Sequence, residues 1–263
     1  MSATVSIGQR GVDLAWRARR RLGPRGRALL RRGVDPVLGP FVGSLHHVAT
    51  DAAIVALTID DGPDPHWTGP VLEVLANTGA RATFFMLVER AEARPDLVRR
   101  VVDAGHEIGL HGVDHSPLPL ARRPIERVLA EGRARLESLS GQPLVWFRPP
   151  FGIQSPGSYR ATRRVGLEVV VWGPEGADWE LSTPGPIAAR LTRATRAGDI
   201  VLLHDGLSPE PPPGHPVAQL DRAAVVDATV AGLAGAGLSC VTVGDLVQTG
   251  RPRRSVWFRP SPQ

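Results

Sequence analysis

The chain has 263 residues, a formal net charge of +5 and one cysteine. This length is sufficient for one large α/β domain with a substantial core. One cysteine excludes a disulfide framework within the chain, and no stretch reaches the ~18 to 20 apolar residues of a membrane-spanning helix.

Positive charge is concentrated at the two ends of the chain. Residues 1–40 carry nine arginines and two aspartates, a balance of +7, whereas residues 249–263 carry four arginines and no acid. The region between them is therefore acidic, at about −6. Nucleic acid is not the expected substrate of this central region, whereas the basic ends suit contact with an anionic membrane surface.

Residues 1–50 are predicted to form an Arg-rich N-terminal extension. Between residues 10 and 34, apolar residues recur among the arginines with helical spacing that is interrupted at Gly23-Pro24. This pattern is typical of a basic amphipathic helix, which either is a solvated surface element or anchors the chain to a membrane surface. The start of the chain lacks the apolar region of a secretory signal, so we expect a cytoplasmic protein.

Residues 51–248 are predicted to form the main domain, followed by a basic tail at 249–263. Short apolar runs alternate there with segments of helical periodicity, which favours a parallel α/β arrangement, most economically a (β/α)7-8 barrel. Predicted strands cover residues 53–59, 82–88, 106–110, 145–148, 167–172, 199–203 and 239–243. Predicted helices cover residues 65–78, 94–104, 124–140, 155–165, 184–197 and 222–235.

The first predicted strand ends in two adjacent carboxylates, Asp60 and Asp61, followed by Gly62-Pro63. Neighbouring residues of a strand point to opposite faces, but a turn at the strand's end can direct both side chains into one cavity. Two acids so placed can take different roles. By itself, the sequence Asp-Asp-Gly-Pro also fits a plain turn.

Polar residues also follow the other predicted strands. In a β/α barrel, the loops after the carboxyl ends of the strands build the active site. We therefore expect the side chains that follow different strands to converge with the two aspartates. These residues are His111, Arg148, Asp178 and His204.

His111 and His115 are four positions apart, a spacing that brings two imidazoles to one ion on a helical turn. Such a pair is also common among surface histidines. Joined to a carboxylate from the first strand, it forms a His-His-Asp set with open positions for water and substrate, as hydrolytic metal ions require.

The segment Arg148-Pro149-Pro150-Phe151-Gly152 follows the fourth predicted strand. Its two prolines stiffen the backbone and leave the Phe151 N–H free to point into a cavity. The Arg148 side chain is always charged and can pair with a carboxylate. The segment is either a stiff structural loop or part of an anion-stabilising site.

Five motifs in this order, across roughly residues 53–247, make the chain similar to the polysaccharide deacetylase family, also known as the NodB homology domain or carbohydrate esterase family 4. Thr58-Ile59-Asp60-Asp61 resembles the TFDD motif, and His111–His115 and Arg148–Gly152 resemble the second and third motifs. Glu175–Trp179 resembles DxxDW, and Leu202–His204 resembles LxH. The resemblance implies a deformed, NodB-like barrel.

The same resemblance implies a metal-dependent hydrolase that removes N-acetyl groups from an amino sugar or glycoconjugate. Asp61, His111 and His115 would bind a divalent metal ion, commonly Zn²⁺ in this family. Asp60 would be the general base that takes a proton from the attacking water, and Arg148 would hold it in place.

The resemblance assigns the remaining roles to the later motifs. His204 would be the general acid that protonates the departing amine, and Asp178 would orient it and tune its charge. The Phe151 N–H would support the oxyanion, whereas Trp179 and Leu202 would wall the acetyl pocket.

The chain departs from the family pattern at two positions. Glu175 stands where the fourth motif usually begins with Asp, and Gly112 replaces the usual Ser or Thr of the second motif. Neither change removes an expected ligand or catalytic group. Both affect the rim of the site and hence the choice of substrate.

Three further expectations concern residues near or outside the motifs. Asp114 and Asp205 lie beside expected site residues and are candidate supporting groups. Cys240 lies in an apolar run and is expected in the core, whereas His46 and His47 are expected at the surface.

Two other functions are compatible with the pattern. A related barrel could open cyclic amides or imides without releasing acetate. An inactive binding protein docked to a membrane by its Arg-rich ends would also keep the fold, although it would have no need to retain all the catalytic side chains. For an enzyme without an export signal, a nucleotide-linked, lipid-linked or natural-product glycoside is a more fitting substrate than an extracellular polysaccharide.

Overall fold

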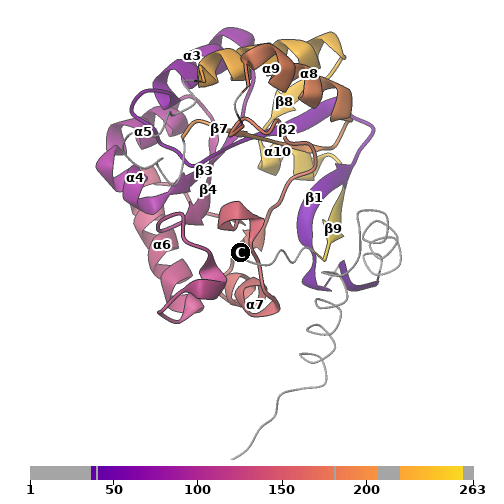
Figure 1. Ribbon diagram of the computed structural model, residues 1–263. Helices are drawn as coiled ribbons and strands as arrows, with labels where there is room; N and C mark the ends of the chain where they lie inside the picture. Colours follow the sequence, from indigo (N-terminus) through magenta and orange to yellow (C-terminus); the bar gives the residue numbers. More distant parts are fainter. Residues whose placement is uncertain (1–36, 40, 181, 207–219, 257–263) are drawn as a thin grey trace, which may run out of the picture.

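The computed structural model describes residues 37–39, 41–180, 182–206 and 220–256. The predicted helices between residues 10 and 34, and the tail beyond residue 256, lie outside the described residues. Figure 1 shows strands surrounded on most sides by helices.

The strands are β1 (Ser44–Ala49), β2 (Ile54–Asp60), β3 (Thr83–Leu87), β4 (Glu107–Gly112), β5 (Trp146–Phe147), β6 (Glu168–Val169), β7 (Ile200–His204), β8 (Ser239–Val241) and β9 (Arg251–Ser255). The helices are α3 (Thr68–Thr78), α4 (Val88–Ala93), α5 (Pro95–Asp103), α6 (Ile125–Ser140), α7 (Pro156–Arg164), α8 (Pro184–Ala194), α9 (Arg222–Gly235) and α10 (Val243–Gln248), with short 3-10 turns η1 (Leu118–Leu120) and η2 (Pro150–Gly152). Every predicted strand and helix of the main domain is found, with shifted ends.

The main sheet has the order β6-β5-β4-β3-β2-β7, with β8 paired to β2, and all of these pairs are parallel. This parallel sheet is curved and carries helices on its outer face, which confirms the predicted β/α barrel. Its strands are buried on both sides, which explains their nearly continuous apolar sequences. The carboxyl ends of β2, β4 and β7 therefore meet at one rim.

The barrel is deformed between β6 and β7, where strand β1 lies. Single bridges join Leu45 to Val170 and His47 to Asp199, and β9 pairs with β1 in antiparallel fashion. This two-stranded ribbon covers the side of the barrel that carries no helix in Figure 1. The folded unit thus extends beyond residues 51–248 into segments that we assigned to the extension and the tail.

His47 is part of this closure, and the expectation of a plain surface residue is wrong. Its Nδ1 lies 3.0 Å from Asp199 Oδ1, and its side chain is 29% exposed. Gly198 accommodates the close approach, because it has a φ of +83° and its backbone N–H and C=O face the neighbouring strands. A Cβ at this position would clash with the Val48 carbonyl.

Inside the barrel, the amino ends of the strands are closed by α10 and a partly buried carboxylate. Glu107 accepts hydrogen bonds from Thr83 Oγ1 (2.6 Å), Trp146 Nε1 (2.7 Å) and the Gly244 N–H (3.1 Å). Apolar side chains from α10, including Val243 and Leu246, complete this layer of the core. The closed end of the barrel therefore stabilises the fold, and the open end is formed by the carboxyl ends of the strands.

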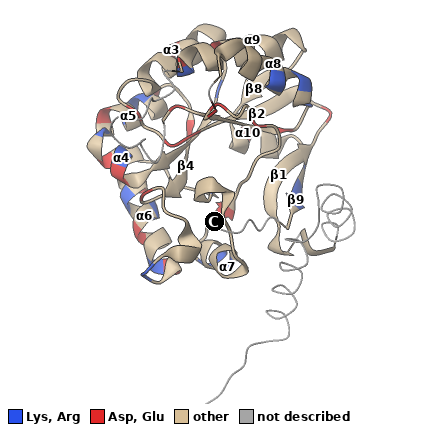
Figure 2. Ribbon diagram, in the orientation of Figure 1, with Lys and Arg blue, Asp and Glu red and all other residues tan. Residues whose placement is uncertain are grey.

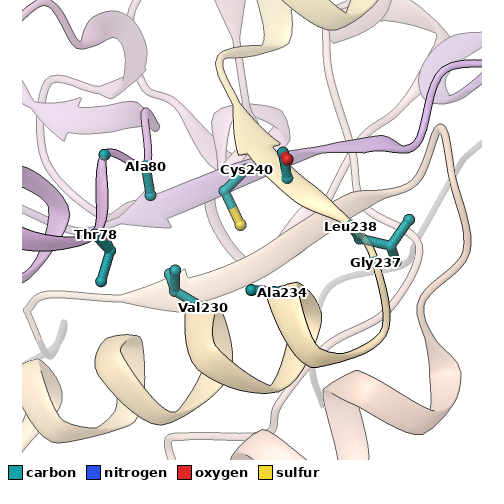
Figure 3. Close-up of a pocket in the computed structure, with 9 residues that line it drawn as sticks. Thr78, Ala80, Val230, Ala234, Gly237, Leu238 and Cys240 are labelled. Carbon is teal, nitrogen blue, oxygen red and sulfur yellow. The ribbon is translucent and has the colours of Figure 1, made fainter.

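Cys240 lies near the amino ends of the strands, beside a pocket of about 320 Å³ between β8, α3 and α9. Figure 3 shows its sulfur directed into the space between the strand and the helix. Burial raises the pKa of the thiol to about 12, so the thiol stays protonated and is a poor nucleophile. The expected core position is confirmed.

The outer helices carry acidic and basic side chains close together, as Figure 2 shows for α4, α5 and α6. Arg135 pairs with Glu92 at 2.5 Å, and Arg127 pairs with Glu131 at 2.8 Å. Such exposed pairs contribute little to the stability of the fold, because water and salt screen them. Among the described residues, no helix is long and apolar enough to cross a membrane.

Candidate active site

Asp60 and Asp61 lie where β2 reaches the open rim of the barrel. Asp60 is the last residue of the strand, and Asp61 follows it with a φ of +76°, a conformation that turns the chain. This turn overrides the alternation of a strand, so both carboxylates face His111, whose Nε2 lies 3.9 Å from Asp60 Oδ2 and 3.2 Å from Asp61 Oδ1. Both aspartates are buried.

Asp205 supports this turn through hydrogen bonds. Its backbone N–H donates to the Asp60 carbonyl at 3.3 Å, and its Oδ2 accepts a 2.5 Å hydrogen bond from the Thr68 hydroxyl. Burial raises the pKa of the Asp205 carboxyl to about 7. A Cβ at Gly62 would clash with this carboxylate, so the glycine of the Asp-Asp-Gly-Pro sequence is required by packing.

A tight reversal of the chain after β4, and not the helical turn that we expected, brings His111 and His115 together. His111 lies in β4, and the following Gly112 has a φ of +125°, which favours glycine. A Cβ at Gly112 would lie 2.7 Å from the Asp114 carbonyl oxygen. The chain thereby reverses and brings His115 Nε2 to 3.2 Å from Asp61 Oδ1. Gly112, a departure from the family pattern, is thus what this turn requires.

The three side chains Asp61, His111 and His115 fit a divalent metal ion. One ligand atom from each lies within 4.8 Å of the others. His111 Nδ1 lies 2.9 Å from the Arg148 carbonyl oxygen. Because this oxygen can only accept a hydrogen bond, Nδ1 carries the proton and Nε2 presents a lone pair to Asp61 Oδ1. Asp61 Oδ1 is itself buried and has no hydrogen-bond donor among the described residues. Converging lone pairs of this kind are satisfied by a cation.

The protonation states of His115 and Asp61 also suit metal binding, which requires deprotonated ligands. Burial lowers the pKa of His115 to about 4, although the charge of Asp61 opposes this shift. Burial disfavours the Asp61 carboxylate, but its close contact with His111 and the charge of His204 outweigh burial and hold its pKa below the usual range.

Arg148 binds Asp60 on the other side of the aspartate pair. Its Nη1 donates to Asp60 Oδ1 and to Thr58 Oγ1, both at 2.7 Å, and its side chain is fully buried. The Thr58 hydroxyl donates in turn to the Val201 carbonyl at 2.6 Å. The two aspartates therefore have different nearest partners: Asp61 lies against two imidazoles, whereas Asp60 binds a guanidinium.

His204, at the end of the neighbouring strand β7, is paired with Asp178. Its Nδ1 lies 2.8 Å from Asp178 Oδ1, and its backbone N–H donates to Asp178 Oδ2 at 2.9 Å. Burial disfavours the imidazolium, but the charge and hydrogen bond of Asp178, helped by Asp61 and Asp60, raise the pKa of His204 to about 9. The ring is therefore protonated at neutral pH, with Nε2–H available to the site.

Replacing Asp178 by asparagine is expected to lower the His204 pKa from about 9, because the variant loses the carboxylate that chiefly compensates for burial, while Asp61 and Asp60 remain. The ion pair stabilises the fold fully below the unfolded imidazole pKa of about 6.5, and this contribution is lost as the pH rises through about 9. An NMR titration of the histidine Cε1–H resonances of metal-free protein measures the shift. His204→Gln identifies the resonance, and an unchanged pKa in D178N would contradict the assignment.

Two aromatic side chains stand at the rim. The Phe151 backbone has a φ of +55°, and its ring centroid lies 4.1 Å from that of His115. No described residue accepts a hydrogen bond from the Phe151 N–H. Trp179 meets the His204 ring edge to face at 5.5 Å. Both aromatic side chains are exposed, whereas Leu202 is buried beneath them in a small cluster with Val171 and Trp172.

Sequence reasoning missed two arginines that support the site. The buried Arg222 in α9 donates through Nη1 to Asp178 Oδ2 at 3.2 Å and to the His204 carbonyl at 2.9 Å. Arg90 in α4 donates to the Asp61 carbonyl at 3.0 Å. Neither residue belongs to a motif, and both reach the site from helices that are distant in sequence, so no local signal could have identified them.

Comparisons with known proteins agree with this geometry. The family model described as polysaccharide deacetylase matches residues 47–170. A peptidoglycan-N-acetylglucosamine deacetylase of Bacillus cereus is 35% identical over 181 residues, which cover 68% of this chain and 83% of the relative. A chitooligosaccharide deacetylase of Sinorhizobium fredii is 36% identical over 172 residues, which cover 65% and 80% of the two chains.

Solved structures show the same fold. A peptidoglycan N-acetylglucosamine deacetylase superposes with a TM-score of 0.68 at 28% identity, covering 79% of this chain and 94% of the other. A family 4 acetyl xylan esterase from Clostridium thermocellum, solved with a cobalt ion, has a TM-score of 0.63 at 32% identity, with coverages of 74% and 90%.

The chain therefore belongs to the polysaccharide deacetylase family. Together with the His-His-Asp set, these relatives define it as a metal-dependent hydrolase that removes N-acetyl groups from carbohydrate. The comparisons favour neither the cyclic amide hydrolase nor the inactive binding protein.

Proposed function

We propose that the chain hydrolyses the acetamido group of an N-acetylated amino sugar with Asp60 as base and His204 as acid. The observation that supports this division of roles is the arrangement around Asp61, His111 and His115. Asp60 is held by Arg148 and lies beside this ligand set, and the His204–Asp178 pair contributes a protonated ring from the end of the neighbouring strand.

Asp61, His111 and His115 would hold the metal ion. When bound, a divalent cation lowers the pKa of water to about 7 and polarises a carbonyl oxygen. Two imidazoles and one carboxylate are typical ligands of Zn²⁺ in hydrolases. We therefore propose Zn²⁺ as the metal.

Asp60 accepts the proton of the attacking water as the water oxygen bonds to the acetyl carbon. Arg148 keeps the Asp60 carboxylate oriented through its 2.7 Å hydrogen bond. A positioned base of this kind contributes about 10² to 10⁴ in rate. The Phe151 N–H, which has no acceptor among the described residues, donates to the oxyanion that develops on the carbonyl oxygen.

His204 donates its Nε2 proton to the departing nitrogen as the carbon–nitrogen bond breaks, so that acetate and a free amine result. Its pKa of about 9 keeps this proton in place at neutral pH, and an amine leaving group requires it. Trp179 and the buried Leu202 lie beside this group and would wall the pocket for the acetyl methyl group.

The relatives' names indicate the sugar. They act on N-acetylglucosamine in peptidoglycan or in chitooligosaccharides. We propose that this chain accepts N-acetylglucosamine within an oligosaccharide or glycoconjugate, including the nucleotide-linked and lipid-linked forms that the sequence favours.

Purified protein loaded with zinc is expected to release acetate from chitooligosaccharides or other N-acetylglucosamine conjugates, and removal of the metal by a chelator should abolish release. An enzymatic acetate assay across a panel of such sugars, with zinc added back as the control, tests the proposal. A zinc-loaded protein that releases no acetate from any member of the panel would contradict it.

The cytoplasmic location and a peripheral contact of the Arg-rich ends with anionic membrane are further proposals. The membrane contact is supported by the charge of residues 1–40 and 249–263. Cell fractionation tests the location. Flotation with anionic vesicles tests the contact, by comparing the full chain with a version that begins at residue 37; equal binding by both would contradict an N-terminal anchor.

A further inference from the structure

Arg148 is a fully buried cation whose hydrogen bonds are incomplete. Only Nη1 is engaged, with Asp60 and Thr58. Nε and Nη2 are buried and have no acceptor among the described residues. Burial lowers the pKa of the guanidinium, although the Asp60 charge opposes this shift. A buried charge that lacks partners is costly, so another group must compensate for the two free nitrogens.

The ring of Phe85 is placed to do this. The guanidinium carbon Cζ of Arg148 lies over the Phe85 ring, 4.1 Å from its centroid, and the Trp172 ring is 5.7 Å away. A cation over an aromatic face within about 6 Å is attracted by the negative potential of the ring. The interaction also restricts the plane of the guanidinium, because this planar group stacks well on an aromatic ring.

The sheet is built to admit this ring. Asp60 on β2 is paired with Phe85 on β3, and Phe85 is paired with Gly109 on β4. A Cβ at Gly109 would lie 2.6 Å from two carbon atoms of the Phe85 ring, Cδ1 and Cε1. Gly109 has an ordinary φ, so space for the ring, and not backbone conformation, explains why a glycine is required here.

We propose that Phe85, seated in the space left by Gly109, is a positioning residue that holds the Arg148 guanidinium with Nη1 directed at Asp60. The inference rests on the proposed role of Asp60 as the base. Without the Phe85 ring, the guanidinium plane is held only by the Nη1 hydrogen bonds and the more distant Trp172 ring, so the donor to Asp60 is less well fixed. Because neither Phe85 nor Arg148 is placed against the substrate, the loss should appear in kcat and not in KM.

The test compares Phe85→Leu with Phe84→Leu in zinc-loaded protein. F85L keeps an apolar side chain but removes the aromatic face, and kcat is expected to fall about tenfold, with KM and zinc content unchanged within about twofold. Phe84 is the matched control, because it is equally buried in the same strand but packs on His106, 5.5 Å between ring centroids. F84L is expected to lower the melting temperature and to leave kcat unchanged. Phe85→Met provides a second side chain without a ring should F85L fold poorly.

Coupling to Arg148 distinguishes positioning from general packing. In an Arg148→Lys background, F85L should reduce kcat by less than about twofold, because the planar cation is already absent. In the NMR spectrum, the Arg148 Nε–H resonance, identified by its loss in R148K, should move in F85L as the ring current disappears. A wild-type kcat in F85L, an equal tenfold loss in both backgrounds, or an unmoved Nε–H resonance would overturn the inference. Failure of the wild-type protein to release acetate would instead contradict the proposed function.

Discussion

Replacing Asp60 by asparagine is expected to lower kcat by about 10² to 10⁴ while leaving the zinc content at one ion per chain. Asparagine keeps the shape of the side chain and can still accept a hydrogen bond from Arg148, but its amide cannot take a proton from water. Because Asp60 is not among the three converging ligands, metal binding should persist. Acetate release and metal analysis on the same preparation measure both quantities.

The contacts of Asp60 make this prediction specific. Its carboxylate has the Arg148 guanidinium at 2.7 Å, whereas its nearest imidazole nitrogen, on His111, is 3.9 Å away. An exposed neighbour, Asp114, is the control, because its carboxylate accepts the Ser116 N–H of a local turn. D114N should keep both zinc and activity. Loss of zinc in D60N would show that Asp60 is a ligand and would overturn the division of roles.

Replacing Asp61 by asparagine is expected to abolish metal binding and activity together. Its Oδ1 lies 3.2 Å from both His111 Nε2 and His115 Nε2 and is the only anionic ligand of the set. Removing this charge leaves two neutral imidazoles for a divalent cation, so zinc affinity should fall by at least about 10- to 100-fold, the range seen when even the groups that orient ligands are lost. Zinc titration by competition with a chromophoric chelator measures the change.

The comparison of D61N with D60N separates the two roles. High zinc should partly restore activity to D61N, because its Asp60, Arg148 and His204 remain in place. It should have no effect on D60N, which already holds the ion. If the two variants lost zinc and activity to the same extent, the assignment of one aspartate to the metal and the other to the proton would be wrong.

The local sequence contained enough information to predict the barrel and the residues around the site. Buried parallel strands have apolar sequences, and helices alternate with them at a different period, so the order of elements is visible along the chain. The catalytic side chains follow these strands, and a parallel sheet places the ends of its strands at one rim. For this reason His111, His115 and a carboxylate of the first strand were predicted as one set, and the family resemblance implied that this carboxylate is Asp61. In the structure, ligand atoms of the three residues lie within 4.8 Å of one another.

Contacts between distant segments were decided only by the tertiary structure. The ribbon of β1 and β9 joins segments about 200 residues apart, and its register depends on pairing that neither strand's sequence reveals. The HxxxH spacing predicted a helical turn, but Gly112 at a φ of +125° produces a tight reversal at the end of a strand. Arg222 reaches Asp178 from a helix with no motif.

What the sequence by itself determined is which side chains stand at the carboxyl ends of the strands, because hydrophobic periodicity and turn residues act locally. The family resemblance implied how the two adjacent aspartates divide their partners, but only the tertiary structure supplies the physical reason for that division. Asp60 meets Arg148 and Asp61 meets the histidines because the backbone turns at Asp61, with a φ of +76°, under support from Asp205 across the sheet. Packing between distant strands, and not the local sequence, sets that direction.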